Sequence, residues 1–239
     1  MNSRRAQHSG FDAAVVSREA DHLNRWPFAK EIYGIAVTGP PNWSVRIGVY
    51  GEWGTGKTSV LEFIAAMAKR EGQIVVRFNP WEHSTKNSLW RAFVLSIFKH
   101  PAIAHIGGGM KARAKELVGG VVKGGAKAIE LGASAWNENA GKGVGVGIEM
   151  VKSLFDFSAG DLKSLRAELG EKRVIVLIDD LDRTAAELVP EILFALKEIM
   201  DVPGFSFICA FDPVVVGDVL GRFHPGFGDG LKFLEKIID

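Results

Sequence analysis

Cysteine is nearly absent from this sequence, since Cys209 is the single cysteine among 239 residues. An intrachain disulfide and a cysteine-rich zinc site are therefore excluded, and the composition fits a reducing compartment. Net charge is also nearly absent, because 29 basic residues face 28 acidic ones and leave a formal charge of +1. This balance gives no clear sign of a nucleic-acid site. The six histidines are scattered, and no pair has a spacing typical of strong metal ligands.

Long hydrophobic runs are missing as well. No stretch reaches about 18 apolar residues without a charge, so no transmembrane helix is expected. The N-terminus has a basic start but lacks the apolar segment of a signal peptide. We therefore expect a cytoplasmic protein and leave peripheral membrane contact open. Apolar residues still make up 47% of the chain, which is enough for the core of one large α/β domain.

Strands and helices are expected to alternate along the chain. This alternation favours a doubly wound parallel sheet with helices on both faces. Apolar, β-branched runs predict strands at 45–50, 74–78, 173–178 and 205–211. Apolar residues at helical spacing predict helices at about 19–35 (restarting at Pro27), 60–71, 88–99, 161–169, 185–200 and 231–238.

The segment GEWGTGKT, from Gly51 to Thr58, matches the Walker A pattern G-x-x-x-x-G-K-[ST]. Its glycines let the backbone approach phosphate, so that the N–H groups of the loop form an anion nest. The loop follows a predicted strand and precedes a predicted helix, the N-terminus of which adds partial positive charge. The alternative is a glycine-rich turn in an unrelated α/β fold. The predicted nucleotide-binding residues are Gly51, Glu52, Trp53, Gly54, Thr55, Gly56, Lys57, Thr58 and Ser59.

The predicted chemistry depends on Lys57, Thr58 and a second motif. Lys57 is expected to contact the β- and γ-phosphates, and the Thr58 hydroxyl to bind Mg²⁺. The third predicted strand ends in Asp179 and Asp180, as a Walker B motif does. We expect this strand to lie beside the Walker A strand, with Asp179 facing Mg²⁺ and Asp180 polarising the attacking water. The alternative is that both carboxylates only cap the following turn or helix.

Two charged residues near these motifs have open roles. Arg183 is a candidate catalytic residue that contacts phosphate in its own site or in a neighbouring subunit. An ion pair with Asp182 is an equal alternative. Asp212 ends the fourth predicted strand, where it orders water or Arg183, or caps a helix that begins at Pro213.

The segments GEWGTGKTSVL, FNPW, VIVLIDDLDR and ICAFDP, in this order, resemble the KAP family of P-loop NTPases. Residues 21–29 are similar to the family's segment before the first strand. The resemblance implies a Mg²⁺-dependent ATPase with an additional strand between the two Walker strands, often a molecular switch near the membrane. Many bacterial members are associated with plasmids or with defence against phage. In FNPW, Asn79 is a candidate to position the nucleophilic water, and Trp81 is expected to pack in the core.

The domain is expected to span 19–239 after a flexible N-terminus at 1–18. A glycine- and alanine-rich insertion at 101–160 carries a weak helical stripe. It predicts a helical element that binds a protein partner or a second copy, with a flexible loop as the alternative. The family resemblance implies a further strand and a helical lid after Asp239. We therefore expect an uncovered sheet edge beside the Walker A strand, which is open to pairing.

Two functions from different classes remain open. The first is an ATP-hydrolysing molecular switch that acts in anti-phage defence. The second is an assembly scaffold that needs ATP but hardly hydrolyses it. A GTPase is less well supported, because the sequence contains no N-K-x-D or T-K-x-D segment to bind guanine. The choice of ATP over GTP comes mainly from the resemblance.

Overall fold

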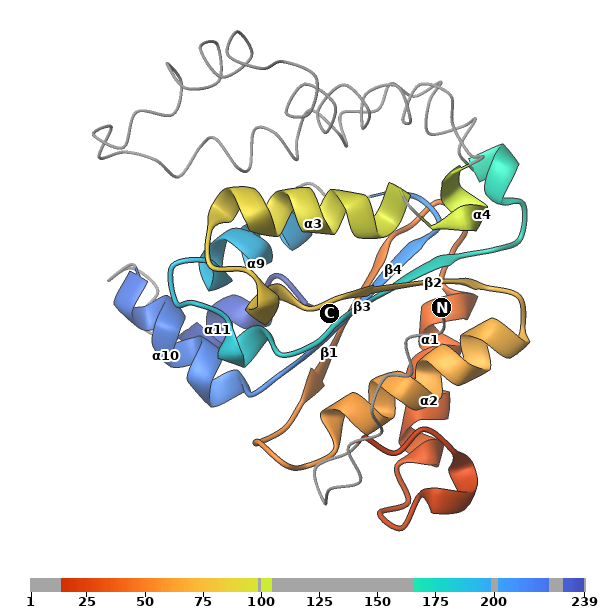
Figure 1. Ribbon diagram of the computed structural model, residues 1–239, viewed down its shortest axis with the longest axis horizontal. Coiled ribbons are helices and arrows are strands. Elements are labelled where there is room, and N and C mark those ends of the chain that lie inside the picture. The colour runs from red at the N-terminus through yellow and green to blue at the C-terminus, as the bar shows by residue number, and fades with distance from the viewer. Residues whose placement is uncertain (1–13, 99, 105–165, 199–201, 224–229, 239) are drawn as a thin grey trace, which may run out of the picture.

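The computed structural model describes residues 14–98, 100–104, 166–198, 202–223 and 230–238. Residues 1–13 of the predicted flexible N-terminus (1–18), residues 105–160 of the predicted insertion (101–160) and residues 161–165 of the predicted helix at 161–169 lie outside this description (Figure 1). The strands are β1 (Val45–Tyr50), β2 (Ile74–Phe78), β3 (Val174–Ile178) and β4 (Phe205–Phe211). The α-helices are α1 (Trp26–Thr38), α2 (Lys57–Arg70), α3 (Lys86–Phe98), α4 (Pro101–Ala104), α9 (Val189–Glu198), α10 (Pro213–Phe223) and α11 (Gly230–Leu234). Short 3₁₀ helices are η1 (Arg18–Ala20), η2 (Pro80–Glu82) and η3 (Leu181–Arg183).

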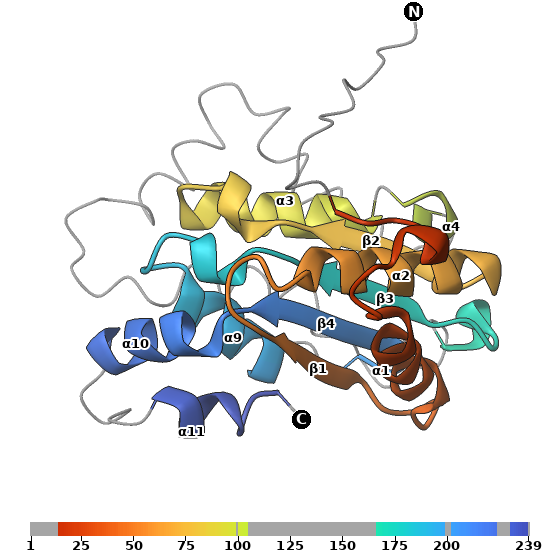
Figure 2. The same ribbon diagram turned by 90° about the horizontal axis from the view of Figure 1, so that it is seen from below.

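The four strands form one parallel sheet in the order β1-β4-β3-β2, and Figure 2 shows β4 beside β1. The expectation that the Walker B strand β3 lies beside the Walker A strand β1 is wrong, because β4 separates them. Every residue of β3 and β4 is buried, whereas β1 is partly exposed. A strand that is apolar on both faces belongs in the middle of a covered sheet. The strand between the two Walker strands agrees with the family resemblance.

Helices cover both faces of this sheet, which confirms the doubly wound α/β fold (Figure 1). Ile175 and Leu177 of β3 pack with α1 and α2 on one face. Val174, Val176 and Ile178 pack with α3, α9, α10 and α11 on the other. This alternation follows from the two-residue period of a strand. In the part of the chain that the structure describes, no helix is long and apolar enough to cross a membrane.

Local sequence signals explain where several helices begin and end. Pro27 lies in the first turn of α1, where its missing N–H group costs no helical hydrogen bond. The Asp21 carboxylate accepts hydrogen bonds from the N–H groups of Arg25 and Trp26 just ahead of that turn. Gly72, with a φ of 74°, follows the C-terminus of α2 as predicted. Ile103 of α4 is buried in the core, although composition placed residue 101 at the start of the insertion.

Candidate functional site

The carboxyl ends of parallel strands meet at one edge of the sheet, and the predicted site residues gather there. The loop after β1 carries the Walker A glycines, and β3 is followed by Asp179 and η3. The turn after β2 begins at Asn79, and Asp212 follows β4 ahead of α10. Segments that are far apart in the sequence therefore contribute to one region.

The Walker A loop has the backbone conformation that its glycines allow. Gly54 and Gly56 have φ angles of 80° and 87°, in the left-handed region that side chains disfavour. A Cβ atom at Gly51 would lie 2.6 Å from the Thr55 hydroxyl oxygen. The loop leads directly into α2, so the helix N-terminus points into the region that the loop surrounds. This is the geometry of an anion-binding loop.

The remaining predicted loop residues differ in exposure and contacts. Glu52 and Trp53 at the tip are exposed, and 84% of the Trp53 surface is accessible. The Ser59 hydroxyl accepts a hydrogen bond from the Val15 N–H, so it ties the N-terminal segment to α2. The predicted phosphate contacts of this loop therefore depend mainly on its backbone N–H groups.

Lys57 is folded back onto its own loop. Its Nζ donates to the Gly51 carbonyl at 2.8 Å and to the Glu52 carbonyl at 3.1 Å. Its Nζ also lies 4.0 Å from Oδ2 of Asp182, and the two side chains are 11% and 10% exposed. The sequence interpretation gave Asp182 no role except as a partner of Arg183. Its contact with Lys57 joins residues distant in the chain, and no local pattern signals it.

Asp179 and Thr58, the predicted magnesium residues, are in contact. The Thr58 hydroxyl hydrogen-bonds to the Asp179 carboxylate, and the Asp180 N–H donates to Asp179 Oδ1 at 3.0 Å. Burial nevertheless raises the pKa of Asp179 above its usual value, more than these hydrogen bonds lower it. Hydroxyl and carboxylate oxygens are ligands that suit Mg²⁺. No three acidic, histidine or cysteine side chains of the described residues could hold a metal ion by themselves. The remaining ligands of a magnesium ion would therefore be phosphate oxygens and water.

The raised pKa of Asp179 predicts a conflict between stability and function at this position. Between the ordinary value of 3.8 and the higher folded value, the folded state binds more protons than the unfolded state. Stability therefore falls as the pH rises through this window, and the ionised carboxylate costs stability at neutral pH. We expect Asp179→Asn to raise the unfolding temperature of the nucleotide-free protein at pH 7, by an amount that shrinks toward pH 3.8. Thermal unfolding across pH tests this, with Glu187→Gln on the exposed surface as the control; a lower unfolding temperature for Asp179→Asn would contradict it.

Asp180 lies at the turn between β3 and η3 in a left-handed conformation, with φ 56° and ψ 34°. Its Oδ2 accepts a hydrogen bond from the Asn79 side-chain amide at 3.1 Å, and its Oδ1 lies 3.4 Å from Arg183 Nη1. The Asp180 side chain makes no capping hydrogen bond to η3. The alternative that it serves only as a cap is therefore not supported. Asn79 also accepts a hydrogen bond from the Trp81 N–H, which fixes the turn after β2.

Arg183 links three segments of the site. It pairs with Asp180 and not with Asp182, so the ion pair with Asp182, one of the two alternatives for Arg183, is wrong. Its guanidinium lies 4.3 Å from the ring centre of Trp81 and 6.0 Å from that of Trp53. Trp81 is 51% exposed, so the expectation that it packs in the core is also wrong. The planar cation stacks on the indole because a guanidinium is weakly hydrated and attracted to the ring face.

Of the two roles proposed for Asp212, the structure supports the capping of the helix that begins at Pro213. Its Oδ1 accepts hydrogen bonds from the N–H groups of Val214 and Val215 at 2.9 and 3.4 Å. These are the first-turn donors of α10, which begins at Pro213. Asp212 is therefore the N-cap of α10.

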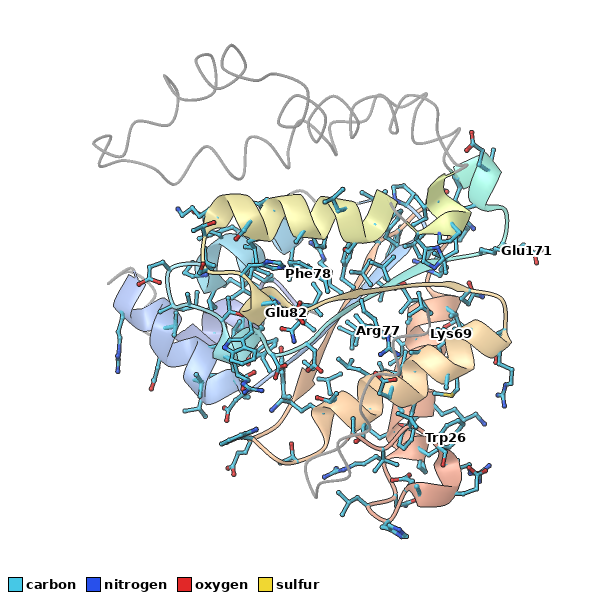
Figure 3. The ribbon with its side chains drawn as sticks, in the orientation of Figure 1. Trp26, Lys69, Arg77, Phe78, Glu82 and Glu171 are labelled. Carbon is cyan, nitrogen blue, oxygen red and sulfur yellow. The ribbon has the colours of Figure 1, made fainter. Side chains whose placement is uncertain are left out.

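A cavity of about 300 Å³ opens on the β2 side of Asp179. Figure 3 shows Arg77 between β2 and α2, where it forms an ion pair with Glu62 of α2. The cavity leaves room for water beside the predicted magnesium carboxylate. Its lining residues are Leu61, Glu62, Arg77, Phe78, Asn79, Glu82, Leu177 and Asp179.

The glycine-rich loop, the lysine at the start of α2 and the carboxylates after β3 define a P-loop nucleotide-binding domain. Comparison with known families agrees with this class. The chain belongs to the KAP family P-loop domain, which matches residues 25–239. Membership of this family supports nucleotide binding.

A curated relative is the phage T7 exclusion protein of Escherichia coli (strain K12), with 26% identity over 255 residues. The match covers 96% of this chain but only 34% of that protein, so the chain spans about a third of its relative's length. Two solved structures of the Aeropyrum pernix ORC2 protein, in ADPNP-ADP and ADP forms, give TM-scores of 0.45 and 0.44 at 14% identity. They cover 91% of this chain and 47% and 48% of those chains. Because both TM-scores are low, the fold assignment depends on the sheet order and the family match.

Proposed function

We propose that this domain binds Mg-ATP, hydrolyses it and acts as a molecular switch. The observation that carries the proposal is the convergence of Lys57, the Thr58–Asp179 pair and Asp180 around one glycine-rich loop. Together these residues offer a cation for the phosphates, oxygen ligands for magnesium and a carboxylate for the attacking water. The bound Mg²⁺ would supply charge neutralisation on the phosphate oxygens.

Each protein group has a distinct role in this proposal. Thr58 and Asp179 would hold the metal, and Lys57 would bind the β- and γ-phosphates. Asp180 accepts a hydrogen bond from the attacking water and orients it, while the Asn79 amide keeps the carboxylate in place. The Arg183 guanidinium is close enough to Asp180 to stabilise negative charge on the phosphates as it develops.

The contacts of Lys57 suggest how the switch operates. Its ammonium group donates hydrogen bonds to the Gly51 and Glu52 carbonyls of the loop. To bind phosphate, the ammonium must exchange at least part of these contacts. Nucleotide binding and release would therefore change the loop at its exposed tip, where Trp53 lies. An attached segment or partner would detect that difference.

Similarity to a phage exclusion protein supports a role in anti-phage defence. We propose that the switch responds to infection through a protein partner or a second copy of the chain. The expected place of action is the cytoplasm, with peripheral contact to a membrane open. The insertion, most of which lies outside the described residues, is one proposed contact surface.

A second candidate function is an ATP-dependent assembly scaffold with little hydrolysis. The observation that favours it is the sheet edge: among the described strands, β1 pairs with β4 alone and leaves its other edge unpaired. Assembly measured with ATP and with a non-hydrolysable analogue separates the two functions. A scaffold would assemble equally with either nucleotide, whereas a switch would cycle only with ATP.

Thermal unfolding with Mg-ATP, Mg-GTP and no nucleotide tests the binding step. At one hundred times the dissociation constant, a ligand stabilises the fold by about 2.7 kcal/mol. We expect a shift of this size with Mg-ATP, a smaller one with Mg-GTP and none in Lys57→Ala. Lys69→Ala, on the exposed side of the same helix, is the matched control and should behave as the wild type. If neither nucleotide shifts the wild type, nucleotide binding by this domain alone is disproved.

A further inference from the structure

We propose that Asp182 makes the site selective for the magnesium complex of ATP over free ATP. This inference rests on the proposed function, because it concerns the same nucleotide site. It assigns a role to a residue that the Walker motifs do not contain. Asp182 would be a specificity-determining residue, and its effect would appear in binding as well as in turnover.

The first observation is the position of Asp182 relative to Lys57. The distance from Asp182 Oδ2 to Lys57 Nζ is 4.0 Å, and both side chains are about nine-tenths buried. Water screens such a pair far less than it screens a pair on the surface. Asp182 therefore competes with incoming phosphate for the cation that is expected to bind it.

The second observation is an unused hydrogen-bond acceptor. Oδ1 of Asp182 is buried and has no hydrogen-bond partner among the described residues. A buried carboxylate oxygen without a hydrogen bond lowers the stability of the fold, because it has lost its contacts with water and has no protein donor in their place. A hydrated divalent cation at the neighbouring Thr58–Asp179 pair would bring water molecules that can donate to it.

The third observation is the balance of charge. Asp179, Asp180 and Asp182 lie at the same sheet edge, with Lys57 and Arg183 as the nearby cations. Free ATP adds further negative charge to this surplus, and Asp182 opposes it both by repulsion and by holding Lys57. Magnesium offsets these charges. Asp182 should therefore weaken the binding of free ATP strongly and the binding of Mg-ATP only slightly.

Calorimetric titration with ATP, in excess EDTA and in excess Mg²⁺, measures the two dissociation constants directly. In Asp182→Asn, we expect binding of free ATP to tighten about tenfold and binding of Mg-ATP to change less than about threefold. The ratio of the two dissociation constants should thus shrink. Asp218→Asn makes the same chemical change on the exposed side of α10 and should leave the ratio unchanged.

The outcomes separate this inference from the proposed function. If the wild type binds Mg-ATP and Asp182→Asn shows the wild-type ratio, Asp182 does not set selectivity. An equal weakening of both forms would indicate a merely structural pair and would also overturn the inference. If the wild type binds neither form, the proposed function fails and this inference with it. Thermal unfolding checks that the variant is folded, and Asp182→Ser, which also removes the charge, repeats the test with a smaller side chain.

Discussion

Asp180→Asn is expected to lower ATP turnover by about 100-fold or more while Mg-ATP binding stays close to that of the wild type. A positioned general base contributes about 10²–10⁴-fold to a rate. An amide keeps the size of the carboxylate but cannot accept the proton of the attacking water. Single-turnover hydrolysis together with calorimetric binding of Mg-ATP measures the two effects separately.

The backbone at Asp180 makes this substitution a clean one. The residue has a φ of 56°, and asparagine tolerates the left-handed region at least as well as aspartate. The amide oxygen can still accept a hydrogen bond from Asn79 or Arg183, so the turn should keep its geometry. Asp180→Ala would add backbone strain, so a loss of turnover in that variant could come from a changed turn and not from the missing carboxylate. Unchanged turnover in Asp180→Asn would exclude Asp180 as the base and would favour the scaffold function.

The Walker A and Walker B residues could be predicted because their signals are local. The eight residues from Gly51 to Thr58 carry the loop conformation in their own glycines, and a fully apolar run ending in Asp179 and Asp180 defines a buried strand with a polar end. The convergence of these ends follows from the parallel sheet alone. Pro27 and Gly72 are also local signals, and they mark the start of α1 and the end of α2.

The order of the strands could not be obtained from residue pattern in the same way. The apolar sequences of β3 and β4 are both suited to a central position, and pairing of either with β1 satisfies the local pattern. The family resemblance, and not periodicity, indicated a strand between the two Walker strands. The exposed position of Trp81 and the contact of Asp182 with Lys57 could not be predicted for a related reason. Their partners, Arg183 and Lys57, come from other segments, and only the assembled sheet edge brings them together.

Arg173 is a second residue for which the sequence gave no signal, and its replacement should have the largest effect on stability. It lies directly before β3 and is 2% exposed. Its guanidinium donates to the Ser206 hydroxyl at 3.1 Å, to the Gly39 carbonyl at 2.8 Å and to the Trp43 carbonyl at 2.8 Å. Burial and the nearby Arg166 lower its pKa from the usual range. These bonds connect β3 and β4 to the loop that leads from α1 into β1.

Arg173→Met is therefore expected to reduce the free energy of unfolding by about 3 kcal/mol or more. Methionine fills much of the same volume, but it removes the donor of buried hydrogen bonds to Ser206 and Phe205 and of part-buried ones to Gly39 and Trp43. The loss of a buried hydrogen bond costs about 1–3 kcal/mol. Arg173→Lys should recover only part of this loss, because an ammonium group cannot reach all the acceptors that the planar guanidinium joins. Urea unfolding measures the difference, with Arg222→Met on the exposed side of α10 as the matched control.

The effect of Arg173→Met can also be measured at the nucleotide site. The loop that Arg173 holds leads into β1, and β1 leads directly into the Walker A loop. A loosened start of β1 would let the Walker A loop fluctuate, so the stabilisation by Mg-ATP should also fall in Arg173→Met. Stability lost without any change in that shift would mean that β4 alone, which pairs with β1 along its whole length, positions the loop. A loss of less than about 1 kcal/mol would contradict the role of Arg173 as a structural connection.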